Sequence, residues 1–170
     1  MSKVQLIKVG RLVPRPAIGQ PLGIMYLASY LRKFLPEAEI QLVDMLAEGL
    51  SLNDLVKRIC EFKPDLLGIS AMSFEAGELH ELARLAKKSF PKMPIVAGGP
   101  YLTTSTLKAF SDQNLDFVVR GEGEQTLLEL VNYLFLGKRE RERERVQILG
   151  LGFRENGQAK INPNRPHLED

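Results

Sequence analysis

Three apolar runs in this sequence each stop abruptly at small residues, and this pattern restricts the fold more than any other feature. The runs lie at residues 64–71, 94–100 and 116–124. Near-continuous apolar segments of this length are typical of strands buried on both faces of a parallel sheet. Because the loops that follow such strands lie side by side along one edge, the small residues predict a groove where backbone approaches a large ligand closely.

Five strand-like segments alternate with helical patterns along most of the chain. We expect strands at residues 4–9, 39–43, 66–70, 94–97 and 117–120, with apolar residues at helical spacing between them. This alternation predicts an α/β fold, a flavodoxin-like (Rossmann-like) five-stranded parallel sheet with strand order 2-1-3-4-5. The topological switch point then falls between the first and third strands, so that the loops after Val9 and Ser70 flank the binding crevice.

The character of the sequence changes after Gly137, which we interpret as the end of a flavodoxin-like domain formed by residues 1–137. Residues 138–147 are a charged connector in which arginine and glutamate alternate. Each positive charge is offset by a neighbour, so a solvated segment is favoured over a nucleic-acid contact. Residues 148–170 predict a small β-hairpin with a turn at Asn156 and Gly157, followed by a linker toward a further domain.

Composition places the chain among soluble globular proteins of one ordinary domain. It has 170 residues, 44% of them hydrophobic, and a formal net charge of +2. That charge is too small to indicate nucleic acid or an anionic membrane as a partner. The longest apolar stretch, residues 127–136, is too short to span a bilayer. No signal peptide precedes the first strand, so the cytoplasm is the expected location.

The cysteine and the histidines do not indicate catalysis by this chain. Cys60 is the single cysteine, which excludes an internal disulfide, and its place beside Ile59 in a helical apolar pattern predicts a core position. His80 falls inside a predicted helix and His167 in the predicted linker. No Ser/His/Asp constellation, zinc-ligand spacing or phosphate-binding P-loop is present. We therefore expect no catalytic residue and no metal ligand here, and a binding function at the strand ends is the better interpretation.

An ordered set of short motifs extends over essentially the whole chain. It comprises residues 19–31, Asp44, residues 63–70, Gly98-Gly99-Pro100, residues 116–124 and residues 150–154. Each piece is weak alone, whereas the set in this order and spacing resembles the N-terminal cobalamin (B12)-binding domain of B12-dependent radical SAM enzymes. In that family a catalytic barrel with a three-cysteine motif follows, after a linker similar to residues 167–170.

The resemblance implies that the chain binds cobalamin, with the corrin ring on the carboxyl edge of the sheet and the nucleotide tail in the crevice. The residues assigned to the cofactor are Ser70, Ala71, Met72, Gly98, Gly99, Pro100, Thr103, Gly121, Glu122, Gly123 and Glu124. Glycine walls with scattered hydroxyl groups suit a long tail of mixed polarity. The downstream radical SAM domain would carry a 4Fe-4S iron-sulfur cluster and S-adenosylmethionine, in a methyltransferase or a related cyclase.

The loop after the first strand departs from the wider cobalamin-binding pattern. Other cobalamin modules place a cobalt-ligating histidine there, and residues 11–19 contain none. The resemblance therefore implies a corrinoid held base-off without a histidine ligand. A second interpretation stays open, a degenerate domain that serves as an interaction or scaffold module without cofactor. A crevice filled by Tyr101 or Met72 would favour it. A third, the nucleotide-sugar-binding half of a glycosyltransferase, needs an acidic metal pair or a phosphate loop that the sequence does not supply.

Overall fold

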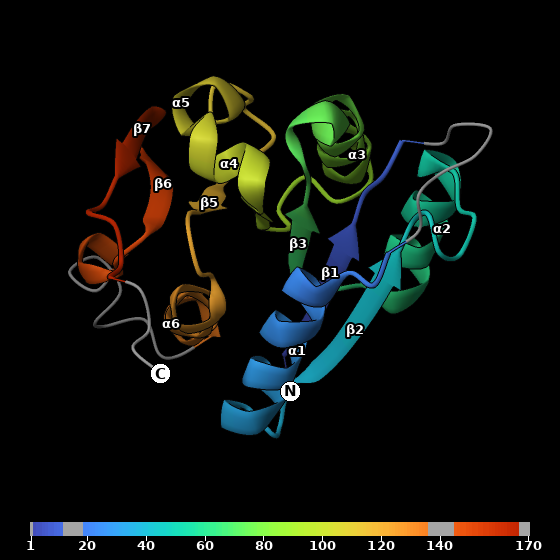
Figure 1. Cartoon of the computed structure of the whole chain (residues 1–170), viewed down its shortest axis with the longest axis horizontal. Coiled ribbons are helices and arrows are strands. Elements are labelled where there is room, and N and C mark those ends of the chain that lie inside the picture. Colours follow the sequence, from blue (N-terminus) through green and yellow to red (C-terminus); the bar gives the residue numbers. More distant parts are fainter. Residues whose placement is uncertain (1, 12–18, 136–144, 167–170) are drawn as a thin grey trace.

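The computed structural model describes residues 2–11, 19–135 and 145–166, which are arranged around a seven-stranded sheet (Figure 1). The strands lie in the order β2-β1-β3-β4-β5-β6-β7. The first five strands pair in parallel, and β6 and β7 continue the sheet antiparallel. The bounds are β1 Lys3–Lys8, β2 Glu39–Asp44, β3 Leu66–Ser70, β4 Ile95–Gly98, β5 Phe117–Val119, β6 Leu151–Glu155 and β7 Gln158–Ile161.

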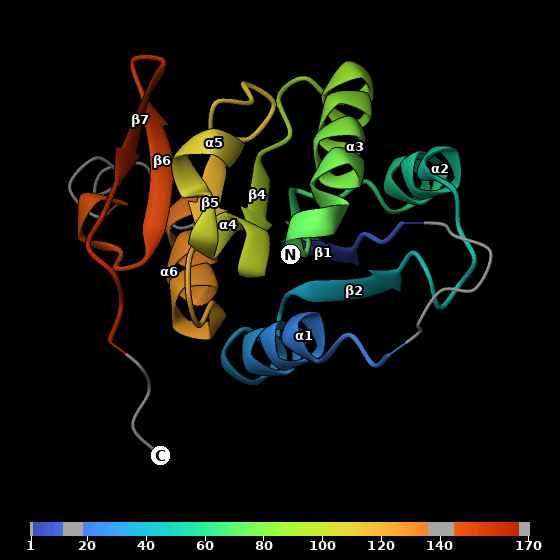
Figure 2. The same cartoon turned by 45° about the horizontal axis from the view of Figure 1, so that its top comes forward.

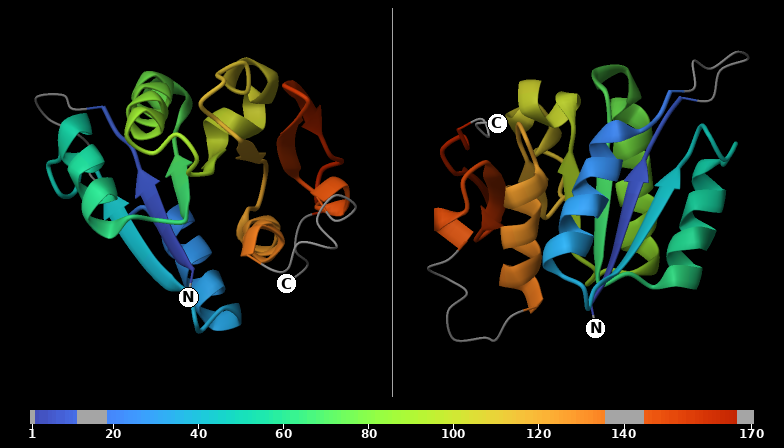
Figure 3. Two further views of the ribbon diagram at one scale, coloured as in Figure 1. Left: turned by 180° about the vertical axis from the view of Figure 1, so that it is seen from behind. Right: turned by 60° about the horizontal axis from the view of Figure 1, so that its bottom comes forward.

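Helices cover both faces of this sheet, as Figures 2 and 3 show. One face carries α1 (Leu22–Phe34) and α6 (Glu124–Phe135). The other carries α2 (Leu52–Phe62), α3 (Ala76–Ser89), α4 (Pro100–Thr104) and α5 (Thr106–Ala109). Two short 3-10 helices, η1 (Ser73–Glu75) and η2 (Arg145–Gln147), complete the described elements. Each layer of helices closes its own hydrophobic core against the sheet.

Alternating side chains on the strands supply both cores. In β1, Leu6 packs under α1 and α6, whereas Ile7 packs into the core beneath the other helices. β3 repeats this arrangement, with Leu66 on the first face and Leu67 on the second. Because both faces are buried, each strand position needs an apolar or small residue, which explains the continuous runs in the sequence.

The predicted order of the five parallel strands is confirmed, but the sheet has seven strands and not five. The hairpin extends the sheet, because β6 pairs with β5 and places Leu151 opposite Val119. Without β6, the edge of β5 would present unpaired N–H and C=O groups, and β6 satisfies them while burying Phe153. The predicted turn is confirmed, since Asn156 and Gly157 have φ angles of 51° and 79°, as a two-residue hairpin turn requires.

Residues 162–166, termed the C-terminal strap, follow β7 and are tied to the rest of the domain. Arg165 Nε donates to Thr126 Oγ1 at 3.0 Å, and Arg165 Nη2 forms an ion pair with Glu129 Oε2 at 2.5 Å. The N–H of Gly150 donates to the carbonyl oxygen of Pro163 at 2.7 Å. The strap therefore lies against α6 and the loop before β6.

Several sequence predictions fall on parts of the chain that the structure does not describe. The predicted domain boundary at residue 137, residues 138–144 of the connector and residues 167–170, which include His167, all lie outside the described residues. Of the connector, only η2 is described. Within residues 2–11, 19–135 and 145–166, no helix combines the length and the apolar character needed to cross a membrane.

The predicted core position of Cys60 is wrong, because this side chain is exposed. The buried stripe of α2 runs through Leu55 and Ile59. Cys60 is one residue further along the helix and points about 100° away from that stripe. α2 begins at a capping box, in which Ser51 Oγ accepts from the Asp54 N–H at 3.2 Å. The hydroxyl group and the N–H of Ser51 both donate to the Asp54 carboxylate, and these hydrogen bonds lower the pKa of Asp54 to about 2.

Candidate functional site

A cavity of about 470 Å³ lies between the sheet and the helix pair α1 and α6, and it extends to the carboxyl edge of the strands. Its sheet wall and helix wall are apolar, and its rim is formed by small and polar residues. The wall residues are Leu6, Gly23, Ile24, Leu27, Gly68, Ile69, Val96, Val119 and Leu127. This volume is within the range of about 300–1,000 Å³ that ligand pockets occupy in proteins.

The cavity brings together the three strand ends that the sequence singled out. All of the predicted site residues except Ala71 and Met72 line it: Ser70, Gly98, Gly99, Pro100, Thr103, Gly121, Glu122, Gly123 and Glu124. Ala71 is buried and Met72 is exposed. Of the two loops predicted to flank the crevice, the one after Ser70 contributes no lining residue, and β3 reaches the cavity through its last residue, Ser70. Among the described residues of the loop after Val9, none lines the cavity.

Sequence reasoning missed the helix wall of the cavity. Gly23, Ile24 and Leu27 of α1 face the strands across it, as does Leu127 of α6. Ile24 and Leu127 belong to the apolar stripes of their helices and to the buried cluster on this face of the sheet. The hydrophobic period predicts which face of a helix is turned toward the sheet. It does not predict whether that face packs against other side chains or lines a cavity. The one usable signal is Gly23, a glycine in the first turn of α1.

Gly98 and Gly99 differ in what they contribute. Gly99 has a φ of +96°, and a Cβ atom there would lie 2.8 Å from the carbonyl oxygen of Ala71. The turn itself therefore requires glycine at this position. A Cβ atom at Gly98 would approach Val119 O only to 3.7 Å, an ordinary contact. Because Gly98 lines the cavity, its missing side chain leaves room for a ligand.

Two loops of the rim are joined by one hydroxyl group. Thr103 Oγ1 accepts from the Gly121 N–H at 3.0 Å and donates to the Gly99 carbonyl oxygen at 3.3 Å. This links the loop after β4 to the loop after β5. Beside it, Glu124 Oε2 is buried and has no hydrogen-bond partner among the described residues. The rim thus holds a carboxylate oxygen that is shielded from water and available as an acceptor.

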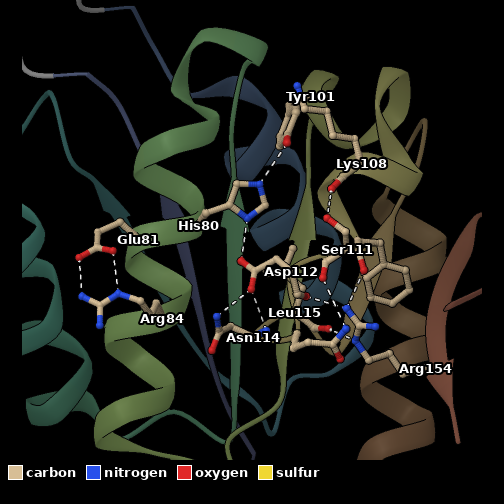
Figure 4. A network of polar contacts seen from close by, with 12 residues as sticks. His80, Glu81, Arg84, Tyr101, Lys108, Ser111, Asp112, Asn114, Leu115 and Arg154 are labelled. Carbon is tan, nitrogen blue, oxygen red and sulfur yellow. Dashed lines mark hydrogen bonds and ion pairs between the residues drawn. The ribbon is translucent and has the colours of Figure 1, made fainter. Parts of the chain in front are cut away.

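Tyr101, a candidate plug of the crevice, packs on the opposite face of the sheet. Figure 4 shows its hydroxyl group directed at His80, with 3.1 Å between Tyr101 Oη and His80 Nε2. His80 Nδ1 lies 2.7 Å from Asp112 Oδ2, which ties α3 to the loop after α5. Burial, and then the negative charge of Asp112, raise the pKa of Tyr101 above its usual value. His80 is thus a partly buried helix histidine, in the helix where the sequence predicts it.

Neither Tyr101 nor Met72 fills the cavity. The structure therefore lacks the filled crevice that would favour a scaffold module without cofactor. Within the described parts of the chain, no group of three or more His, Cys, Asp or Glu side chains is placed to hold a metal ion. What the site offers is an apolar slot with a polar rim, suited to binding an aromatic group that carries polar substituents.

Comparison with protein families identifies this arrangement. The model of the B12 binding domain matches residues 10–131, which is most of the chain. The chain belongs to the B12 binding domain family. The matched segment of this B12 binding domain contains every residue that lines the cavity except Leu6.

Two curated proteins resemble this B12 binding domain along almost its whole length. An uncharacterized methyltransferase of Pyrococcus horikoshii is 39% identical over 153 residues, covering 89% of this chain and 32% of the relative. Cytidylyl-2-hydroxyethylphosphonate methyltransferase of Streptomyces wedmorensis is 31% identical over 170 residues, covering 89% and 30%. The chain therefore spans about a third of the length of these relatives.

A solved structure shares the fold of this B12 binding domain. The cobalamin-dependent S-adenosylmethionine radical enzyme OxsB with aqua-cobalamin bound superposes with a TM-score of 0.82 at 23% identity. The match covers 98% of this chain and 23% of OxsB. This agreement supports the flavodoxin-like α/β architecture, including the strands that follow the parallel part of the sheet.

Proposed function

We propose that this chain binds cobalamin with the nucleotide tail of the cofactor inside the cavity and its base detached from cobalt. The observation that carries the proposal is an open apolar cavity at the carboxyl edge of the sheet in a member of the B12 binding domain family. The OxsB structure of the same fold holds aqua-cobalamin. Bound cobalamin would supply a cobalt centre able to carry a methyl group.

The chemistry of the cavity fits such a tail. Val96, Val119 and Leu127 offer apolar surface for a flat aromatic base. Gly98 leaves room beside that surface, since no side chain occupies it. Ser70 and Thr104 place hydroxyl groups at the rim, where the polar ribose and phosphate of the tail would lie. Together with the other predicted rim residues, these groups would hold the cofactor.

Neither the loop after β1 nor His80 would supply a histidine to the lower face of cobalt. Residues 11–19 contain no histidine, and His80 is engaged with Asp112 and Tyr101 on the opposite face of the sheet. Electron paramagnetic resonance of the cobalt(II) form tests this point. We expect a base-off spectrum without hyperfine splitting from an axial nitrogen. A nitrogen-split spectrum would contradict a detached base without a histidine ligand.

We further propose that the parent protein is a radical SAM methyltransferase, whose 4Fe-4S cluster and S-adenosylmethionine are bound outside this chain. The names of the two curated relatives support a methyltransferase, and the third of their length that this chain spans supports a larger parent protein. The radical SAM assignment is supported by the similarity of fold to the S-adenosylmethionine radical enzyme OxsB. The continuation of the coding sequence provides the test. A Cys-x-x-x-Cys-x-x-Cys motif within the following domain is expected, and a continuation without it would contradict this part of the proposal.

Substitution of Gly98 tests the cavity directly. We expect the purified chain to bind hydroxocobalamin, measured by calorimetry and by the absorbance of the retained corrinoid. Gly98→Val should weaken binding by about 10- to 100-fold, because the new side chain enters the cavity. The turn should survive, since a Cβ atom at Gly98 makes only ordinary contacts.

Gly152→Ala is a matched control, because Gly152 lies in a strand, tolerates a Cβ atom at 3.5 Å from Val118 Cβ and does not line the cavity. Its affinity should equal that of the unmodified chain. Equal binding by the Gly98→Val variant would place the ligand elsewhere. If no cobalamin form binds to the unmodified chain, the cofactor-free scaffold becomes the better explanation.

A further inference from the structure

Glu124 is the first residue of α6, and it lines the cavity. Its Oε2 atom is buried and unpartnered among the described residues. The other buried side-chain atoms without a partner belong to Gln5, Glu78, Arg120 and Arg145, none of which lines this cavity. Glu124 therefore combines an unused acceptor with a position on the cavity wall.

Several other polar side chains, from the rim and from α6, already have partners. Thr103 bridges the two loops, and Thr104 Oγ1 donates to Pro100 O at 3.0 Å. Thr126 Oγ1 donates to Leu149 O at 2.8 Å and accepts from Arg165. A buried acceptor left without a donor is unfavourable, and the penalty is larger for a charged group. A ligand group that donates a hydrogen bond would remove this penalty at Glu124.

We propose that Glu124 determines which corrinoids the cavity accepts, by taking a hydrogen bond from a neutral N–H or O–H donor of the ligand. This inference rests on the proposed cobalamin-binding function. Cobalamin carries such donors in two places, the peripheral amide groups of the corrin and the hydroxyl groups of the ribose. A carboxylate at the same place would lose the hydrogen bond and face Glu124 as a like charge, so the cavity selects the amide or hydroxyl form.

Two substitutions separate the acceptor from the charge. Glu124→Leu removes the acceptor and should weaken hydroxocobalamin binding about tenfold or more, because the ligand donor then stays unpaired. Glu124→Gln keeps an acceptor oxygen and loses the charge. It should bind hydroxocobalamin within a few-fold of the unmodified chain, and circular dichroism of both variants checks that α6 is retained.

Corrinoid analogues identify the source of the donor. The unmodified chain and both variants are titrated with hydroxocobalamin, with its b-, d- and e-monocarboxylic acids, and with cobinamide, which lacks the nucleotide. If the donor is an amide, one monocarboxylic acid should bind the unmodified chain about tenfold more weakly, and Glu124→Gln should remove most of that difference. If the donor is a ribose hydroxyl, the loss in Glu124→Leu should vanish with cobinamide.

Glu78→Leu is the matched control for this experiment. Glu78 is also an acidic residue in the first turn of a helix, and its Oε2 atom is likewise buried without a partner. It lines a second cavity, of about 490 Å³, that does not share residues with the first. Corrinoid affinity should be unchanged in this variant.

The outcomes distinguish this inference from the proposed function. Hydroxocobalamin binding of equal strength by the unmodified chain and by Glu124→Leu overturns the role of Glu124 and leaves cobalamin binding intact. A loss of the same size in Glu78→Leu also overturns it, because the effect would then be general to buried acidic residues. Absence of binding by the unmodified chain overturns both proposals.

Discussion

Gly98 and Gly99 are adjacent glycines whose missing side chains have different structural reasons. Gly99 is required by the backbone, since its positive φ and its contact with Ala71 leave no place for a side chain. Gly98 has an ordinary backbone conformation and free space toward the cavity. One glycine is therefore required by the turn, whereas the other leaves space in the cavity, a distinction that the pair Gly-Gly in a sequence does not reveal.

This distinction leads to a prediction about stability. Gly99→Ala should lower the free energy of unfolding by about 1–3 kcal/mol, because alanine at positive φ is strained and its Cβ atom meets backbone. Gly98→Ala should change it by less than about 0.5 kcal/mol, as substitutions without a special feature do. Urea unfolding of the two variants measures both values. Equal destabilisation would contradict the separate roles.

At the scale of elements, α4 is a helix that depends on its surroundings. It has five residues, Pro100–Thr104, too few for a helix that is stable in isolation. Leu102 anchors it in the core beneath α3, and Tyr101 joins it to His80. Because Pro100, Thr103 and Thr104 line the cavity, these anchors on the far face of α4 set the position of the cavity rim.

Removal of the Tyr101 hydroxyl group tests this anchoring. Tyr101→Phe keeps the ring and should destabilise the chain at pH 7 by about 0.5–1.5 kcal/mol through loss of one hydrogen bond. The pKa of Tyr101 is raised by burial and by Asp112, so the unfolded chain loses this proton at lower pH than the folded chain. Stability should therefore fall above about pH 10.

That decline should be smaller in the Tyr101→Phe variant, as measured by urea unfolding between pH 9 and pH 11. Tyr26→Phe serves as the control, because Tyr26 is exposed. A Tyr101→Phe variant with unchanged stability at neutral pH and an unchanged decline in base would contradict the anchoring role.

For the whole molecule, the C-terminal strap connects parts that are distant in sequence. Arg165 reaches Thr126 and Glu129 on α6, and Pro163 accepts from Gly150 before β6. Arg165→Ala should therefore speed hydrogen exchange at the Gly150 amide, because the strap that protects it loses its anchor.

Nuclear magnetic resonance measures this exchange residue by residue. Amides of β1 and β3 should exchange as before, since these strands lie far from the strap in the sheet order. Lys160→Ala is the control, because the Lys160 side chain is exposed and its ion pair joins it to Glu155 of the hairpin rather than to the strap. Unchanged exchange at Gly150 in the Arg165→Ala variant would show that the strap is held by other contacts.

The parallel part of the fold could be predicted from local patterns, because strands buried on both faces need unbroken apolar runs. The Asn156-Gly157 turn was equally local, since few residue pairs accept positive φ twice in succession. The partner of the hairpin was not predictable in this way. Its pairing with β5 depends on which sheet edge is left open once the whole sheet has formed.

The site also has a part that local sequence patterns predict and a part that they do not. The rim residues follow strand ends and were found from sequence, whereas Leu27 and Leu127 of the helix wall were not, because an apolar stripe looks the same over a cavity as over a filled core. The contact between His80 and Asp112 joins residues 32 positions apart. The local sequence around His80 and the local sequence around Asp112 do not predict this contact.

The loop of residues 121–124 lines the cavity and is flanked on both sides by contacts with the strap. Arg120 Nη2 donates to Asn162 O at 3.3 Å just before residues 121–124, and Thr126 receives Arg165 just after them. Thermodynamic linkage makes any coupling through this loop reciprocal. A ligand that binds more tightly when the strap is docked would hold the strap more firmly, and release of the strap, as in the Arg165→Ala variant, would lower ligand affinity by the same factor.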